Sequence, residues 1–255
     1  MLNKRIAATI AAVLAIAALP ASALAAPDWA RVDQTLGRPG VEQAAGVHRY
    51  SFPRSDLRVT LDGVAIRPAL ALGSWAAFQP MGDAAAVMGD LVLTQDEVNP
   101  VMSRLLAGGF AITALHNHLL RSAPATMYMH IAGHGDPVKL AQALRQALAA
   151  SGTPLGAPPA APAAAPPLDL DTAAIDRLIG GRGKANGGVY QFSFPRAEQV
   201  TDAGMATPAA MGTATTINFQ PTGAGTAAIT GDFVLVASEV GLVMQALRAS
   251  GIEVT

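Results

Sequence analysis

The chain has 255 residues and no cysteine, and its 17 Lys and Arg against 18 Asp and Glu give a net charge of −1. The lack of cysteine excludes disulfides, thiolate metal ligands and a cysteine nucleophile, so a hydrophobic core must stabilise the fold. The balanced charge, without a basic block, excludes an electrostatic surface for nucleic acid or for an anionic membrane.

The N-terminus has the three-part layout of a secretory signal peptide. Lys4 and Arg5 precede an apolar run over residues 6–19, and Ala23-Leu24-Ala25 offers the small residues of a cleavage site. The run is too short and too rich in alanine for a bilayer-spanning helix, which needs about 20 strongly apolar residues. We therefore expect an exported protein, periplasmic or secreted, with no transmembrane segment after signal cleavage.

A sequence duplication organises the rest of the chain. Residues 46–54, GVHRYSFPR, return as residues 188–196, GVYQFSFPR, and further matches follow in the same order at an offset of roughly 142 residues. These matches are Phe78-Gln79-Pro80 with Phe219-Gln220-Pro221, Gly89-Asp90 with Gly231-Asp232, and Glu97-Val98 with Glu239-Val240. The sequence therefore predicts two tandem copies of one module.

A stretch rich in proline and alanine over residues 156–167 separates the two copies and favours extended polyproline II geometry. The second copy matches the first only as far as Thr255, which aligns with Thr113. We therefore expect a C-terminally truncated second module. The predicted organisation is a signal peptide (1–25), a first module (26–152), an Ala/Pro-rich linker (153–168) and a second, incomplete module (169–255).

Four segments rich in β-forming residues open the first module. Pro53 separates the first two, and Asp62-Gly63 supplies a turn after the second. Pro80 and Gly82 separate the last two. The predicted strands are residues 47–52, 57–61, 74–79 and 86–94.

The second half of this module is predicted to alternate helix, hairpin and helix. Thr94 with Glu97 three residues later has the spacing of a capping box, and apolar residues then follow at helical intervals. Residues 110–120 and 126–132 form a strand pair, and Asp136-Pro137 starts a second helix. The predicted fold class is therefore α+β, with two tandem copies of a mainly antiparallel sheet module and about two helices per complete copy.

All five histidines lie in the first module, and four gather in its final strand pair: His116, His118, His130 and His134. Residues two apart in a strand face the same way, so His116 and His118 can chelate one ion. His130 or His134 on the neighbouring strand can supply a third nitrogen, as in catalytic zinc sites. The pattern predicts a site for a divalent metal such as zinc, and the alternative is a set of solvated or hydrogen-bonded polar residues.

Two repeated charged positions are further candidates. Glu97 and Glu239 recur at a helix start, where a carboxylate completes a cap. Arg54 and Arg196 recur after Phe-Pro and can bind an anion, whereas the structural alternative is an exposed strand terminus. No Ser motif with a matching base points to a serine nucleophile.

Four runs of the sequence resemble the LppY/LpqO family, exported bacterial proteins defined by a domain of unknown function. The runs are residues 70–78 (LALGSWAAF), 88–93 (MGDLVL), 114–118 (ALHNH) and 129–136 (MHIAGHGD). The resemblance covers nearly the whole mature chain and implies export and a duplicated module, but no settled activity. The chain departs from the family by lacking a lipid-attachment cysteine and a second His-Asn-His run.

These observations lead to three hypotheses of function. The first is an exported binding protein whose four histidines line a polar cleft for a divalent metal, a small molecule or an envelope component. The second is a metal-dependent hydrolase, for which Glu97 and Asp90 are the candidate general bases. The third is a structural scaffold for an envelope partner. The uncovered edge of a truncated module also predicts a homo-oligomer.

Overall fold

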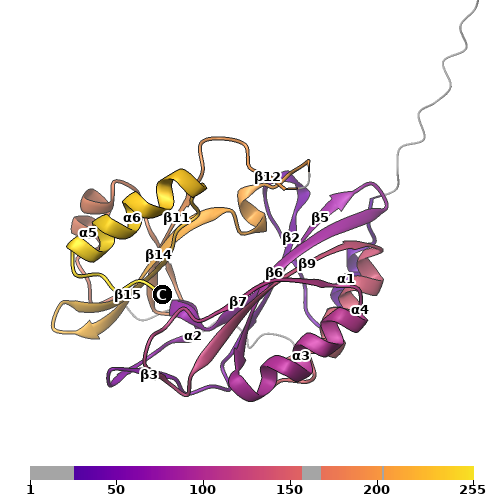
Figure 1. Ribbon diagram of the computed structural model, residues 1–255, viewed down its shortest axis with the longest axis horizontal. Helices are drawn as coiled ribbons and strands as arrows, with labels where there is room; N and C mark the ends of the chain where they lie inside the picture. The colour runs from indigo at the N-terminus through magenta and orange to yellow at the C-terminus, as the bar shows by residue number, and fades with distance from the viewer. Residues whose placement is uncertain (1–25, 157–167, 203) are drawn as a thin grey trace, which may run out of the picture.

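The computed structural model describes residues 26–156, 168–202 and 204–255 (Figure 1). The predicted signal peptide and residues 157–167 of the predicted linker lie outside these ranges. The described residues form two α+β modules built on antiparallel sheets, so the predicted fold class and tandem repeat are confirmed.

Module one is built on a six-stranded sheet in which every neighbouring pair is antiparallel. The long central strand β6 alternates side chains between two faces, with Leu91 and Leu93 on the face that packs against the helices and Asp90 and Val92 on the other. In spatial order the strands are β1 (Val41–Glu42), β2 (His48–Pro53), β5 (Gly73–Met81), β6 (Ala84–Thr94), β9 (Thr126–Gly135) and β7 (Ala111–His116).

The strand predicted over residues 57–61 is much shorter in the structure. Only β3 (Thr60–Leu61) is extended there, and it pairs with β4 (Val64–Ala65) and β8 (Ser122–Ala123) in a separate small sheet. The preceding residues turn because Asp56 binds the guanidinium of Arg54 and the Leu57 amide donates to the Arg54 carbonyl.

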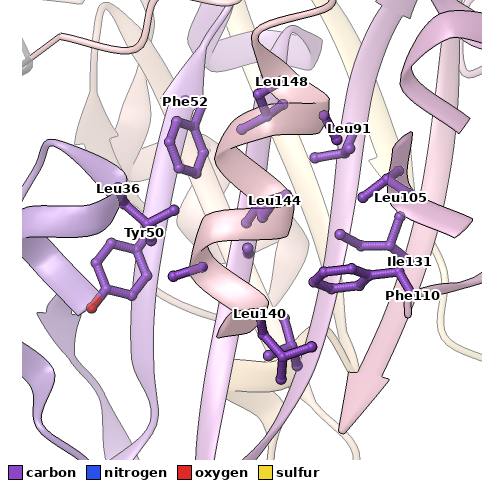
Figure 2. Packing of buried hydrophobic residues seen from close by; sticks show 14 of the residues in the cluster. Leu36, Tyr50, Phe52, Leu91, Leu105, Phe110, Ile131, Leu140, Leu144 and Leu148 are labelled. Atoms are coloured by element: carbon purple, nitrogen blue, oxygen red, sulfur yellow. The ribbon is translucent and has the colours of Figure 1, made fainter. Parts of the chain in front are cut away.

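Three helices cover one face of this sheet: α1 (Trp29–Leu36), α3 (Gln95–Ala107) and α4 (Pro137–Leu148) (Figure 1). Figure 2 shows Leu140, Leu144 and Leu148 of α4 among core side chains that include Phe52 and Leu91. The structure adds α1 and the single-turn α2 (Pro68–Ala71) to the two helices that the sequence predicted for this module.

The predicted starts of α3 and α4 are confirmed. Asp136 Oδ1 accepts the Val138 amide at 2.8 Å, with Pro137 in the first helical position. Glu97 accepts the Thr94 amide at 2.8 Å, so its carboxylate satisfies an open amide at the N-terminus of α3.

Module two repeats the first four strands of this sheet and two of its helices. Its described residues contain no counterpart of β7, β9 or α4. The strands, in spatial order, are β10 (Lys184–Asn186), β11 (Val189–Pro195), β14 (Ala214–Gly223) and β15 (Thr226–Asp232), and the helices are α5 (Thr172–Ile179) and α6 (Ala237–Ala249). A small hairpin, β12 (Thr201–Asp202) with β13 (Met205–Ala206), follows β11 as β3 and β4 follow β2.

The two modules pack with α1, α3, α4, α5 and α6 on the outside and their sheets toward one another, and the short α2 lies between the sheets (Figure 1). The inner face of the second sheet carries polar side chains that donate hydrogen bonds to backbone carbonyls of α2. Gln191 Nε2 donates to the Ala69 carbonyl at 2.8 Å, and Thr230 Oγ1 donates to the Leu70 carbonyl at 3.1 Å. These contacts bring the end of β15 beside the segment that follows β7.

Candidate metal centre

A row of paired residues crosses the inner face of the first sheet. Trp75 on β5 lies opposite Asp90 on β6, and Asp90 lies opposite His130 on β9. Because Met129 and Ile131 on either side of His130 point into the core, His130 points to the inner face. Asp90 and His130 are therefore neighbours by register.

A bulge in β7 brings His116 to the same face. Ile112 lies opposite Ile131, but Ala114 rather than Thr113 lies opposite His130, so one extra residue is inserted. His116 then lies opposite Tyr128 on the inner face. Without the bulge, the two-residue period would turn His116 toward the helices.

Three histidines converge at this point. His116 Nε2 lies 3.0 Å from His130 Nε2, and one ligating nitrogen from each of His116, His118 and His130 lies within 4.8 Å of the others. The strand ends at His116, so His118 belongs to the following loop rather than to the predicted longer strand. Its ring stacks on Tyr128, with 3.9 Å between the ring centroids, and this contact turns it back toward the cluster.

His134 lies outside this group of three. It shares the parity of His130 on β9, but four residues at about 3.3 Å each place the two positions about 13 Å apart. Its side chain is exposed, opposite Ala86. The structure therefore brings together three of the four histidines named from the sequence.

Two aspartates, one from each module, face the cluster. Asp90 Oδ2 lies 3.8 Å from His130 Nε2, and Asp232 Oδ1, at the end of β15, lies 3.0 Å from His118 Nδ1. Asp90 is 9% exposed, and its Oδ1 has no hydrogen-bond partner among the residues that the structure describes. Asp232 is not among the site residues predicted from the sequence, although the repeated Gly-Asp pair makes it the counterpart of Asp90.

Burial and the neighbouring charges shift the pKa values of this cluster in different directions. Burial raises the pKa of Asp90 and lowers the pKa of His130. The charge of His130 acts to lower the pKa of Asp90, and the charge of Asp90 acts to raise the pKa of His130, but burial outweighs both effects. Burial also acts to lower the pKa of His118, but the hydrogen bond and the charge of Asp232 outweigh it, so this pKa is raised. A neutral His130 offers the lone pair that a metal ligand needs.

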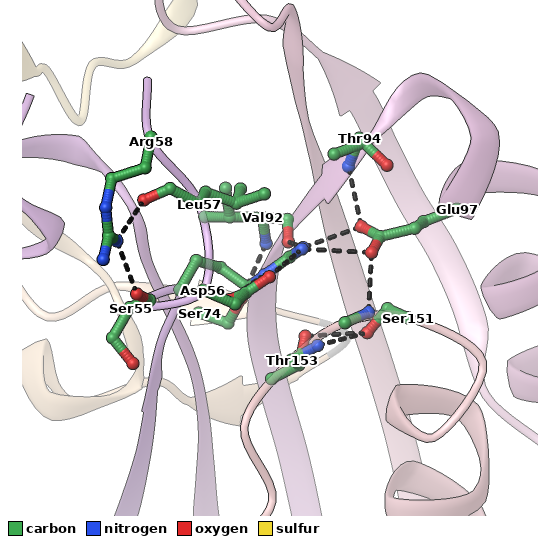
Figure 3. Close-up of polar contacts among 12 residues, drawn as sticks. Ser55, Asp56, Leu57, Arg58, Ser74, Val92, Thr94, Glu97, Ser151 and Thr153 are labelled. Atoms are coloured by element: carbon green, nitrogen blue, oxygen red, sulfur yellow. Dashed lines mark hydrogen bonds and ion pairs between the residues drawn. The ribbon is translucent and has the colours of Figure 1, made fainter. Parts of the chain in front are cut away.

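Glu97, the other candidate general base, does not reach the histidines. Its two carboxylate oxygens accept hydrogen bonds from Arg54 at 2.7 and 3.0 Å, and they also accept hydrogen bonds from the backbone amides of Thr94 and Gly152 (Figure 3). Asp56 and the Val92 carbonyl complete the surroundings of Arg54. These oxygens are fully used in structural contacts, so Glu97 is not a base for this site.

Neither interpretation of Arg54 offered by the sequence fits the structure. Arg54 is fully buried rather than an exposed strand terminus, and two carboxylates already occupy its guanidinium instead of a bound anion. Arg196 repeats the arrangement by donating to Glu239 at 2.7 and 2.9 Å and pairing with Glu198. The recurring Phe-Pro-Arg motif therefore links the end of β2 to the start of α3, and the end of β11 to the start of α6.

The donor set fits a transition-metal ion. Two imidazole nitrogens bound to one zinc ion at about 2.1 Å lie about 3.4 Å apart in tetrahedral geometry, close to the separation of His116 and His130. His118 would be a third nitrogen ligand. Asp90 lies outside this group of ligand atoms, with Oδ2 3.8 Å from His130 Nε2, and its carboxylate would have to turn toward the ion to be an oxygen ligand. Three histidines and one carboxylate suit zinc and its neighbours in the first transition series better than calcium or magnesium.

The fold and the site together define a two-module α+β protein with a histidine cluster at the junction of its modules. The chain belongs to the family described as Domain of Unknown Function (DUF1259), whose profile matches residues 30–150 and 173–255. The three histidines lie in the first matched segment and Asp232 lies in the second. No curated protein matches the chain, and no solved structure matches it. Within the described residues, no helix has the length and apolar character needed to cross a membrane.

Proposed function

We propose that this protein is an exported binding protein for a divalent transition metal, held by His116, His118 and His130 with Asp90 as the fourth donor. The observation that carries the proposal is the convergence of three imidazoles beside a buried carboxylate with a free oxygen. An ion would accept the histidine lone pairs and the charge of Asp90 at once. It would also compensate for the cost of burying that carboxylate.

The alternative, a solvated polar face, accounts less well for the same geometry. The three histidine residues are only partly exposed, and the side chain of Asp90 is 13% exposed. Two neutral imidazoles 3.0 Å apart can share one hydrogen. The Oδ1 atom of Asp90 still has no hydrogen-bond donor among the described residues. A bound cation satisfies all four side chains together.

The test is zinc binding by the purified chain without its predicted signal peptide, compared with a variant in which His116 and His118 are both changed to Ala. We expect about one zinc ion per chain for the wild type and none for the double variant, measured by elemental analysis and titration calorimetry. His134→Ala removes an exposed histidine from the same strand and is the matched control. Equal zinc binding by the wild type and the double variant would overturn the proposal.

A second candidate function is metal-dependent hydrolysis, and the free Oδ1 of Asp90 favours it. A zinc ion lowers the pKa of a bound water, and a carboxylate beside it can take the proton as the water attacks. The zinc-loaded protein would be screened with activated esters and phosphate esters. If Asp90 is a general base, Asp90→Asn should abolish turnover and keep the zinc affinity. If Asp90 is a metal ligand, the same substitution should weaken zinc binding.

Export and the closer kinship with the LppY/LpqO family are part of the same proposal. The layout of residues 1–25 and the four sequence runs given above support them. Export is tested by fusing residues 1–35 to an alkaline phosphatase that is active only after export. We expect this fusion to show phosphatase activity, and we expect a fusion in which a charged residue replaces Leu14 in the apolar run to show none. A fusion that stays inactive in the cytoplasm would overturn this part.

The scaffold hypothesis makes the opposite prediction for the histidines. It predicts that an envelope partner binds equally well to the wild type and to the variant with Ala at positions 116 and 118. Loss of partner binding together with zinc would instead tie the partner to the metal site.

A further inference from the structure

We infer that the metal site is shared by the two modules, because Asp232 of module two positions the ligand His118 of module one. This inference rests on the proposed metal-binding function and extends it from three ligands to the arrangement of the whole chain. It gives module two a role in a site whose proposed ligands all lie in module one.

Module two holds the loop that carries His118 at three points. Asp232 Oδ1 lies 3.0 Å from His118 Nδ1, and Thr255 Oγ1 donates to the Asn117 carbonyl at 2.6 Å. Glu253 accepts from Arg121 at 2.9 and 3.0 Å. Module one also holds this loop, because Asp62 pairs with Arg121 and Tyr128 stacks on His118, and module two adds the three contacts above. His116 and His130 are fixed by the first sheet.

The contact with Asp232 has a chemical consequence that the other two lack. A carboxylate that accepts from Nδ1 fixes the hydrogen on that nitrogen and leaves the Nε2 lone pair of His118 free for an ion. It also makes the imidazole a stronger donor. Metal sites commonly use such carboxylate partners, and losing one typically costs roughly 10- to 100-fold in affinity.

The two repeated aspartates take different roles because the repeats meet face to face. Asp90 lies within the first sheet, next to His130, and its side chain is 13% exposed. Asp232 ends the edge strand β15 and reaches across to His118, and its side chain is 57% exposed. Asp90 can therefore contact the ion, whereas Asp232 acts through a histidine and is a positioning residue.

Binding and docking must then be coupled. An ion that binds the docked arrangement more tightly than the undocked one stabilises the docking by the same free energy. We expect zinc to slow hydrogen exchange in residues 117–121 and at the end of β15. The effect should disappear in Asp232→Ala.

The experiment compares zinc affinities of the full chain by competition with a chromogenic chelator. We expect Asp232→Ala to weaken binding by roughly 10- to 100-fold and Asp232→Asn, which keeps an acceptor without the charge, to lie in between. Arg121→Gln removes the contacts of the same loop with Glu253 and with Asp62 of module one without touching His118, and it should stay near the wild type. Absorption of bound Co²⁺ should change in the Asp232 variants and remain unchanged in Arg121→Gln.

The outcomes separate this inference from the proposed function. A wild type that binds no zinc overturns the proposed function. A wild type that binds zinc, with Asp232→Ala equal to it in affinity and Co²⁺ spectrum, overturns the inference alone. Equal losses in Asp232→Ala and Arg121→Gln also overturn it, because loop anchoring rather than the carboxylate would then set the affinity. Thermal melts without metal check that each variant is folded.

Discussion

The two modules share their strand order, but the apolar side chains of their helices are buried to different extents. In module one, Val101 and Leu105 of α3 are completely buried. In module two, α6 has no buried residue, and Leu242 is 70% exposed. The strands and helices thus follow from local sequence that both copies retain. Burial depends on β9 and α4, which have no counterpart among the described residues of module two.

The position of α4 shows the difference most directly. In module one, Leu144 and Leu148 lie among Leu36, Phe52 and Leu91 (Figure 2). In module two, the repeat counterparts of those three residues line an open groove of about 730 Å³. They are Ile179, Phe194 and Phe233, respectively. The same kind of apolar surface is therefore core in one copy and accessible in the other.

The largest expected contrast concerns the repeated arginines. Arg54→Ala leaves Glu97 partly buried without its partner, and breaking such a pair costs about 3–5 kcal/mol of unfolding free energy. Arg196→Ala should cost much less, because the side chain of Glu239 is 38% exposed and water replaces the lost partner. Urea unfolding of the two variants measures the contrast, and equal losses would contradict the difference in burial.

A smaller contrast is expected between the apolar helix positions. Leu144→Ala empties a fully buried site and should cost about 2–5 kcal/mol. Leu242→Ala removes a side chain that is mostly exposed and should change the stability by less than about 0.5 kcal/mol. The same urea titration serves both variants. A large loss in Leu242→Ala would mean that the groove is covered in solution, for instance in the homo-oligomer expected from the sequence.

Much of the fold could be predicted because its signals are local. Strand periodicity and the helix starts at Thr94 and Asp136 needed only neighbouring residues. Helix α1 was missed although Asp28 caps it and Gly37 ends it with φ 74°, because eight residues give too few turns for a convincing period. Its counterpart α5 has the same signals at Asp171 and Gly180.

The candidate site was less predictable because it depends on register and on contacts between modules. The His-Asn-His run could be read from the sequence, but the bulge that turns His116 inward could not. Asp232 lies more than a hundred residues from His118 and reaches it only through the docking of the two sheets. The repeat relation to Asp90 was the available signal, and it became informative once the modules were placed face to face.

The smallest expected contrast is in acid stability. Burial acts to raise the pKa of Glu97, but hydrogen bonds from Arg54 and from the Gly152 and Thr94 amides outweigh it and hold the pKa below its ordinary value. A depressed carboxyl pKa stabilises the fold above the unfolded pKa, near 4.5, and this contribution is lost as the pH falls through the folded pKa. Glu97→Gln should therefore lower stability at neutral pH and reduce its loss in acid.

The counterpart Glu239 has a pKa lowered to about 2, mainly by the hydrogen bond from Arg196, so its contribution is lost only as the pH falls toward 2. This pair is more exposed, so salt should weaken it more than the pair of Arg54 and Glu97. Urea midpoints from pH 7 to pH 3, at low and high salt, measure both effects in Glu97→Gln and Glu239→Gln. A stronger salt effect on the contribution of Glu97 would contradict the view that only module one shields its ion pair from solvent.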